Sequence, residues 1–233
     1  MEIKCDPSPF IATVNDLLRE LSRVNFFEHG LLIGSWPMVV YSQVHGLMYG
    51  LRTNDIDFAV LNTARKADGT PLPNLLKQLG YELLTDYQSG IEKYVQETFE
   101  IEFLMHRKGG AAPSAVDLPA WQVAAQLLPF IDILFLHPVT VNIEDYSLSI
   151  PSPEALMVHK LIIAQRRTGR DRLEKKEKDL QQCSSLAEII KAEEVQWILL
   201  EKRMSKDVRK EIAISCEEAD LEMDVLGLYW PGK

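Results

Sequence analysis

The most constraining feature of this chain is the run Asp55-Ile56-Asp57-Phe58, which opens the segment "DIDFAVLN". Its alternation of acidic and apolar residues predicts a strand with one buried face. Side chains two positions apart in a strand share a face, so Asp55 and Asp57 lie side by side while Ile56 and Phe58 enter the core. Two carboxylates at that spacing repel each other unless a cation neutralises them. The sequence therefore predicts a cation site on this face.

A second acidic strand is predicted from Thr98 to Leu104, where "TFEIEFL" alternates again. Glu100 and Glu102 share one of its faces, and pairing beside the first strand would add a third carboxylate to the cluster. Glu102 is preferred because it lies nearer the end of the strand, although a solvated strand face is the alternative for both glutamates. Mg²⁺ suits such oxygen ligands. One or two Mg²⁺ ions held here could clamp an in-line phosphoryl displacement.

Gly34-Ser35 lies upstream, between a short apolar strand at Leu31 to Ile33 and a helix predicted over Met38 to Met48. Glycine lets the backbone approach a ligand closely, and free amides at a helix start bind phosphate. Ser35 can add its hydroxyl as a donor. Trp36 could stack on a nucleotide base, but core packing is the favoured role. We therefore predict that this turn anchors the phosphates of a nucleoside triphosphate held by metal on the acids.

Composition narrows the class of protein. The 233 residues carry a formal charge of −9, which argues against non-specific coating of nucleic acid. The three cysteines, Cys5, Cys183 and Cys216, form no CxxC pair and favour a reducing compartment. The beginning of the chain, "MEIKCDPSPF", lacks the pattern of a signal peptide, and the longest apolar tract is interrupted by Pro129 and Asp132. We expect a soluble cytoplasmic protein with no membrane partner.

The pattern of elements predicts an α+β fold of α/β-like character. We expect a mixed-sheet core flanked by helices over residues 1–152, followed by a helical region over residues 153–233. Three further predictions concern single elements of the first region. They are a helix over Phe10 to Val24, a hairpin built around Glu144-Asp145, and a loop over residues 106–120 that leads into a helix from about Trp121 to Leu136.

Gly-Ser followed by Asp-Ile-Asp and a third acid on a later strand resembles the DNA polymerase β-type nucleotidyltransferases. Within that superfamily, "RTNDIDF" resembles a bacterial group of uncharacterised nucleotidyltransferases and AbiEii-like toxins. The segment "IPSPEALMVHKLIIAQRRTGRDRLEKKEKDLQQCSSL" is similar to that group's Pro-rich lead-in, helical Lys and Lys-Asp-Leu helix. The likeness covers roughly residues 30–190 and leaves the last forty residues unplaced.

The resemblance implies a role for each matching residue. Gly34 and Ser35 would contact the triphosphate, Asp55 and Asp57 would hold metal, and Glu102 would be the third ligand and the base for the incoming hydroxyl. On the predicted helices, Lys160 would reach nucleotide phosphates, with Asp179 as an acid on the next helix. The 153–233 region would then complete the cleft for nucleotide and acceptor beside a catalytic domain at 1–152. Two departures are the nineteen residues between Ser35 and Asp55 and a Glu where many members have Asp.

A basic stretch stands out within the acidic chain. From 160 to 178 it carries a local net charge of +5. It is either a solvated helical face with i,i+4 ion pairs or a contact surface for phosphate or polynucleotide. Its basic residues are Lys160, Arg166, Arg167, Arg170, Arg172, Lys175, Lys176 and Lys178.

The preferred function is Mg²⁺-dependent transfer of NMP from an NTP to a hydroxyl acceptor, with release of pyrophosphate. The acceptor could be RNA, a protein or a small molecule. An alternative is a non-catalytic nucleotide-binding or regulatory module of a toxin–antitoxin or defence pair, with a partner protein. Fold analogy does not choose the acceptor, because the acceptor pocket is the variable part of such enzymes.

Overall fold

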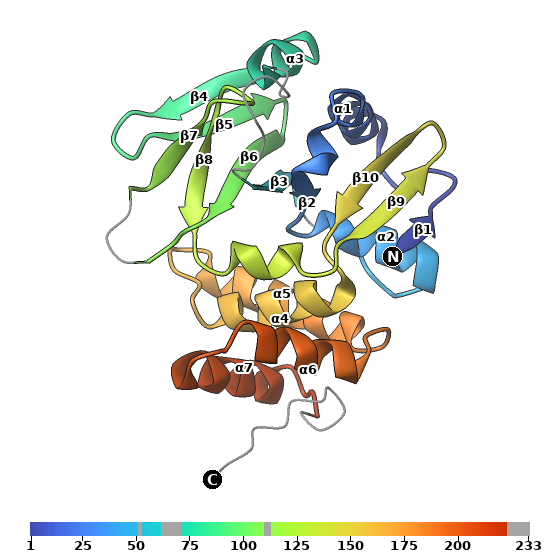
Figure 1. Ribbon diagram of the computed structural model, residues 1–233, viewed down its shortest axis with the longest axis vertical. Coiled ribbons are helices and arrows are strands. Elements are labelled where there is room, and N and C mark those ends of the chain that lie inside the picture. The colour runs from blue at the N-terminus through green and yellow to red at the C-terminus, as the bar shows by residue number, and fades with distance from the viewer. Residues whose placement is uncertain (51–52, 62–70, 110–112, 223–233) are drawn as a thin grey trace. The chain divides into compact units, whose positions relative to one another are not determined.

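The structure is a computed structural model, and its contacts divide the chain into two units (Figure 1). It describes residues 1–50, 53–61, 71–109 and 113–222. Unit 1 comprises Met1–Val44 and Gly50–Pro151, and unit 2 comprises His45–Tyr49 and Ser152–Lys233. The sequence predicts a boundary at residue 152, with a catalytic domain over 1–152 and a region that completes the cleft over 153–233. Those roles stay predictions.

The larger sheet of unit 1 has seven strands and mixes parallel with antiparallel pairs. Its main order is β2-β3-β6-β5-β4, and β8 pairs with β6 and with β7. The central pair, β3 and β6, is parallel. The strands are β2 (Gly30–Leu32), β3 (Asp55–Val60), β4 (Glu82–Asp86), β5 (Ile91–Gln96), β6 (Phe99–His106), β7 (Ala115–Leu118) and β8 (Val123–Leu128).

An aromatic cluster forms the core on one face of this sheet. The rings of Phe58 and Phe103, on the neighbouring strands β3 and β6, stack with their centroids 5.8 Å apart. Phe26 packs edge-on against Phe58 at 5.3 Å and against Trp121 at 5.4 Å. Tyr94 of β5 meets Phe103 at 6.2 Å. Burying these rings fixes which face of β3 and β6 is inward, because a slip by one residue would turn them outward.

A second sheet of three strands, in the order β1-β9-β10, packs with helix α1. Its strands are β1 (Glu2–Lys4), β9 (Val139–Ile143) and β10 (Tyr146–Ile150). The hairpin predicted around Glu144-Asp145 is confirmed as β9 and β10, and the helix predicted over Phe10 to Val24 is confirmed as α1 (Ala12–Arg23). The helix buries an apolar stripe of Val14, Leu17, Leu18 and Leu21.

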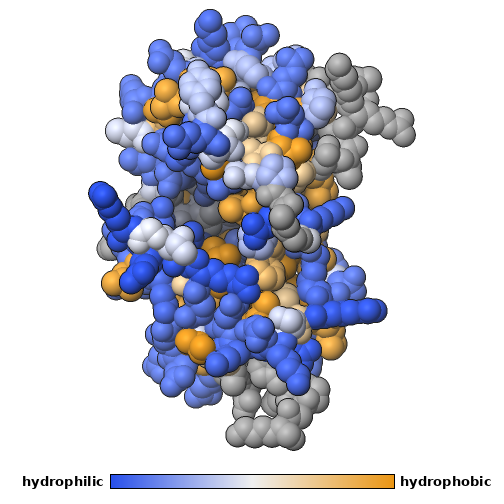
Figure 2. All heavy atoms as spheres, turned by 90° about the vertical axis from the view of Figure 1, so that its left-hand side faces the viewer, coloured by the Kyte–Doolittle hydropathy of each residue, from blue (hydrophilic) through white to orange (hydrophobic). Residues whose placement is uncertain are grey.

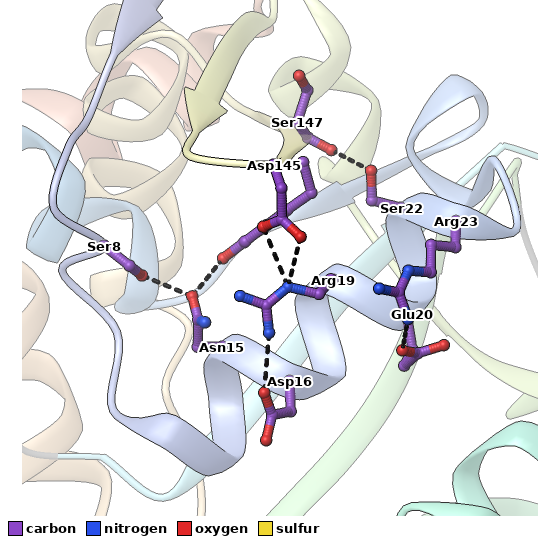
Figure 3. Close-up of polar contacts among 10 residues, drawn as sticks. Ser8, Asn15, Asp16, Arg19, Glu20, Ser22, Arg23, Asp145 and Ser147 are labelled. Atoms are coloured by element: carbon purple, nitrogen blue, oxygen red, sulfur yellow. Dashed lines mark hydrogen bonds and ion pairs between the residues drawn. The ribbon is translucent and has the colours of Figure 1, made fainter.

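Polar contacts fasten α1 to the β9–β10 hairpin (Figure 3). Arg19 reaches Asp145 with its Nε at 3.1 Å and Asp16 with its Nη1 at 2.9 Å. Asn15 accepts a hydrogen bond from the hydroxyl of Tyr146 at 2.7 Å, and Ser22 donates to the backbone of the hairpin. Apart from the Arg19–Asp16 pair, which lies within α1, these contacts join residues more than a hundred positions apart, so the hairpin is an integral part of unit 1.

The predicted helix from about Trp121 to Leu136 is wrong. The structure has strand β8 there, followed by a short 3-10 helix, η2 (Ile131–Phe135). A continuous apolar run fits a buried strand as well as a helix, and periodicity does not separate the two. Gln122 and Phe130 adopt positive φ on either side of β8 and so interrupt any helix. The predicted loop over 106–120 also contains a strand, β7.

The described residues of unit 1 also form three shorter helices. They are η1 (Phe26–Glu28), α2 (Trp36–His45), which extends to the boundary with unit 2, and α3 (Leu72–Gln78). Helix α2 was predicted two residues later, from Met38 to Met48. The amide of Met38 donates to the carbonyl of Ser35 at 3.2 Å, and the helix begins at Trp36, directly after the Gly34-Ser35 turn.

Unit 2 is helical, as the pattern after Pro153 predicted. Ser152 caps its first helix by accepting a hydrogen bond from the amide of Ala155 at 3.2 Å, and Pro153 occupies the first turn. Almost every residue of that helix is buried, which makes it the central helix of the unit. The four helices are α4 (Pro153–Ala164), α5 (Arg172–Leu186), α6 (Ala192–Glu201) and α7 (Lys206–Glu218).

The face of the molecule shown in Figure 2 carries mostly hydrophilic side chains. On the face shown in Figure 2, hydrophobic residues lie in small groups among hydrophilic ones. Among the described residues, no helix is both long and apolar enough to cross a membrane.

Candidate active site

Four carboxylates lie on one face of the central strands of unit 1. In the parallel pairing of β3 with β6, Asp55 is opposite Glu100 and Asp57 is opposite Glu102. All four are partly exposed, whereas their neighbours Ile56 and Ile101 are fully buried on the other face. Paired positions in a sheet point the same way, so the predicted metal ligands share a face together with Glu100.

The Gly34 turn lies directly against one of these acids. A Cβ on Gly34 would come within 2.4 Å of Oδ2 of Asp57, a distance no side chain could keep. Gly34 also has φ of +71°, which favours glycine over every other residue. The amide of Ile33 donates to the carbonyl of Asp57 at 2.9 Å and holds the two segments together. The structure therefore brings the predicted phosphate turn and the predicted metal face into contact.

Ser35 and Trp36 join this turn to helix α2. Ser35 is buried, and its carbonyl begins the helix. The indole Nε1 of Trp36 donates to the backbone carbonyl of Asp55 at 2.8 Å, and the ring packs beside Phe10 and Phe99. Trp36 is thus a core residue that ties the start of α2 to the start of β3, as favoured from the sequence. It positions the acids but is too buried to stack on a base.

Lys93 is a site residue that the sequence analysis missed. Its Nζ lies 2.6 Å from Oε1 of Glu102 and 2.9 Å from Oε2 of Glu100. Partial burial lowers the pKa of Lys93, but the hydrogen bonds that its ammonium group donates to Glu102 and Glu100 outweigh it and raise the pKa overall. The sequence gives little signal for this contact, because a single Lys on strand β5 looks like an ordinary exposed residue until the strand order is known.

The donor chemistry of this face fits a divalent metal ion. Asp55, Asp57 and Glu102 offer carboxylate oxygens, which Mg²⁺ prefers, and the acids of β6 already hold a cation, the ammonium group of Lys93. Within the part of the chain that the structure describes, no three His, Cys, Asp or Glu side chains gather closely enough to hold a metal ion. A metal held by all three predicted ligands would require their side chains to move closer together.

Lys160, the predicted phosphate ligand, belongs to unit 2 and is almost fully buried. Its Nζ donates to Oδ1 of Asp179 at 3.1 Å, and Nε of Arg167 donates to Oδ2 of the same carboxylate at 2.7 Å. Burial by itself raises the pKa of Asp179, but Lys160 and Arg167 outweigh it and hold the pKa below its ordinary value. A phosphate contact by Lys160 would require this buried pair to open.

The basic stretch from 160 to 178 forms several ion pairs inside unit 2. Besides the two cations on Asp179, Arg166 pairs with Glu211 at 2.9 Å, and Lys176 pairs with Glu218 at 2.7 Å. Lys175 also pairs with Asp171, four residues before it. These contacts favour the reading of a helical face with ion pairs over that of a free polynucleotide surface.

One comparison with known protein families identifies the family of this chain. The sequence matches a family described as nucleotidyltransferase over residues 12–206. No protein of curated function matches it significantly.

Three solved structures resemble the chain at low identity. An antigenic nucleotidyltransferase-like protein from Paracoccidioides brasiliensis shares 16% identity over 92% of this chain and 97% of its own, with a TM-score of 0.43. A tRNA-processing enzyme shares 14% over 96% of this chain, with a TM-score of 0.31. A tRNA nucleotidyltransferase in complex with a primer tRNA and an incoming ATP analogue shares 12% over 88%, with a TM-score of 0.25. The chain spans 61% of each of the last two. Because the family match covers most of its length, the chain belongs to the nucleotidyltransferase family.

Proposed function

We propose that the chain is an Mg²⁺-dependent nucleotidyltransferase of the polymerase β type, which transfers NMP from an NTP to a hydroxyl acceptor. One observation carries the proposal: Asp55, Asp57 and Glu102 share a face of two parallel strands, and Gly34 lies against Asp57. Acids alone on a strand face would not distinguish a metal site from a solvated strand face. A glycine turn that opens a helix beside them supplies the phosphate-binding half of the same site.

In the proposed reaction, the acceptor hydroxyl oxygen bonds to the α-phosphorus, and the bond from that phosphorus to the bridging oxygen of the leaving pyrophosphate breaks. Glu102 accepts the hydroxyl proton. Asp55, Asp57 and Glu102 would hold one or two Mg²⁺ ions, whose bound charge stabilises the charge on the transferring phosphoryl group. Gly34 and Ser35 would orient the triphosphate through backbone amides and the Ser35 hydroxyl. The contribution of the protein is positioning and charge neutralisation.

Two finer assignments belong to this proposal. The motif "RTNDIDF" supports placement in the bacterial AbiEii-like group, and with it a cytoplasmic location and a toxin–antitoxin partner. The sequence leaves RNA, a protein and a small molecule as acceptors, and the ion pairs of the basic stretch leave fewer free cations for RNA phosphates. This favours a protein or a small molecule as the acceptor.

The non-catalytic alternative has one observation in its favour. Lys93 neutralises both acids of β6, so the face can be stable without a metal ion. A nucleotide-binding or regulatory module would need no more than this. Titration of the protein with NTP and Mg²⁺, followed by a transfer assay, separates the two functions.

The test follows the label of an α-phosphate-labelled NTP into RNA, protein or small-molecule fractions of a cell lysate. We expect Mg²⁺-dependent labelling by the wild type and a loss of at least about a hundredfold in Asp55→Asn and Asp57→Asn, because removing one well-placed charge-stabilising group typically costs that much. Asp117→Asn, the same change at an exposed position on β7, is the matched control. Full transfer by both site variants would refute the proposal, and nucleotide binding without transfer would support the module.

A further inference from the structure

Lys93 contacts Glu102, the acid that the proposed metal ion would share with Asp55 and Asp57. It comes from β5, which pairs antiparallel with β6, and its side chain lies on the same face as Glu100 and Glu102. The shorter of its two contacts is the one to Glu102, the predicted third metal ligand. Its ammonium group reduces the repulsion among the four carboxylates of this face.

Glu102 binds a metal ion less strongly while it is paired with Lys93. Its Oε1 is 2.6 Å from the ammonium group, and a positive charge this close opposes the approach of a second cation. Because a metal bound by Asp55, Asp57 and Glu102 brings a second positive charge to the same carboxylate, we expect the contact between Lys93 and Glu102 to lengthen or break. Metal binding and this ion pair are therefore competing states of one carboxylate.

We propose that Lys93 is a positioning residue that competes with the divalent cation for Glu102. It holds the face together when no metal is present, and it releases Glu102 when metal and nucleotide arrive. The inference rests on the proposed function, because it requires a metal at Asp55 and Asp57. It implies that the metal alone binds weakly and that the nucleotide phosphates complete a tight site.

Partial exposure makes such an exchange feasible without opening the core. The side chains of Lys93 and Glu100 are each 40% exposed, and that of Glu102 is 21% exposed. The backbone pairs between β5 and β6 do not involve the ammonium group. Lys93 also contacts Glu100, which can keep the ammonium group after Glu102 has turned away. This gives Glu100 a role, although it is not one of the predicted ligands.

The test measures Mn²⁺ affinity in the absence of nucleotide, with free Mn²⁺ followed by electron paramagnetic resonance. We expect Lys93→Met to bind Mn²⁺ about three- to tenfold more tightly than the wild type, as loss of two partly exposed ion pairs allows. Lys93→Arg keeps the charge and should remain close to the wild type. Lys77→Met, at the end of α3, removes the same charge away from the sheet face and should change nothing.

Glu100→Gln probes the same competition from the other side. Without this second partner, Lys93 remains on Glu102, so Mn²⁺ should bind more weakly than in the wild type. This variant keeps the proposal testable if Lys93→Met fails to fold. Equal or weaker affinity in folded Lys93→Met, or tighter affinity in Glu100→Gln, would overturn it.

Asp57→Asn separates failure of this inference from failure of the proposed function. If the wild type binds Mn²⁺ and Asp57→Asn does not, the metal site stands, and an unchanged Lys93→Met refutes only the competition. If neither the wild type nor Lys93→Met binds Mn²⁺ in either the presence or the absence of NTP, both proposals fall.

Discussion

Asp179 of unit 2 and Glu102 of unit 1 are both carboxylates held by cations of the chain, but in opposite surroundings. Asp179 is completely buried, with Lys160 on one oxygen and Arg167 on the other. Glu102 is partly exposed, and its partner Lys93 is more exposed still. A buried acid that pairs with two cations of the chain cannot exchange them for another cation without opening the core. An acid at a partly exposed face can exchange its cation. Burial therefore separates a structural ion cluster from a candidate metal site.

The largest effect on stability should come from breaking the buried ion cluster of Asp179, Lys160 and Arg167. Asp179→Asn leaves Lys160 buried beside a neutral group, and we expect a loss of about 3–5 kcal/mol in the free energy of unfolding. The same change at Asp57 removes one of four like charges from a partly exposed face and should alter stability by less than about 1 kcal/mol. Urea unfolding followed by helical circular dichroism compares the two. Equal losses would remove the contrast between the sites.

The pH dependence sharpens the same comparison. The pKa of Asp179 is lower in the folded chain than in the unfolded chain, because Lys160 and Arg167 outweigh the effect of burial. Its contribution to stability is therefore present above the unfolded value, about 4, and is lost as the pH falls through the lower folded value. Stability measured between neutral pH and about pH 3 should drop more steeply in the wild type than in Asp179→Asn. Parallel curves would show that the cluster does not act as described.

Gly34→Ala tests the close approach of the turn to Asp57. The new Cβ would meet Oδ2 of Asp57 at 2.4 Å and would also force a positive φ on alanine, so we expect a loss of about 2–4 kcal/mol and weaker Mg²⁺–nucleotide binding. Gly90→Ala is the matched control, since Gly90 has φ of +70° but open space around it. It should lose only about 1–2 kcal/mol and bind nucleotide normally. Similar behaviour of the two variants would show that contact with Asp57 is unimportant.

The smallest effect is expected in the half-exposed ion pairs of unit 2. Lys176 pairs with Glu218 at 2.7 Å near the surface, and Lys176→Met should change the free energy of unfolding by less than about 1 kcal/mol. The same urea experiment measures it. A loss as large as that of Asp179→Asn would mean that exposure does not distinguish the two kinds of pair.

The sequence predicts the strands and turns of the site better than it predicts which strands pair and which side chains meet. The alternation of Asp55-Ile56-Asp57-Phe58 predicts strand β3 and its buried face, because burial of one face imposes a period of two. The pairing of β3 with β6 depends on the strand order, which local pattern does not encode. The contact of Lys93 with these acids depends on the same strand order, whereas the burial of Lys160 depends on how the helices of unit 2 pack around Asp179. The apolar run after Trp121 was misassigned because it lacks any period.

The most direct test of the proposed active site is a crystal structure with Mn²⁺ and a non-hydrolysable NTP analogue, in which anomalous scattering locates the metal. We predict Mn²⁺ within about 2.3 Å of carboxylate oxygens of Asp55 and Asp57, with Glu102 as a further ligand and the phosphates at the Gly34-Ser35 turn. Metal and phosphates bound elsewhere, with these acids free of both, would contradict it.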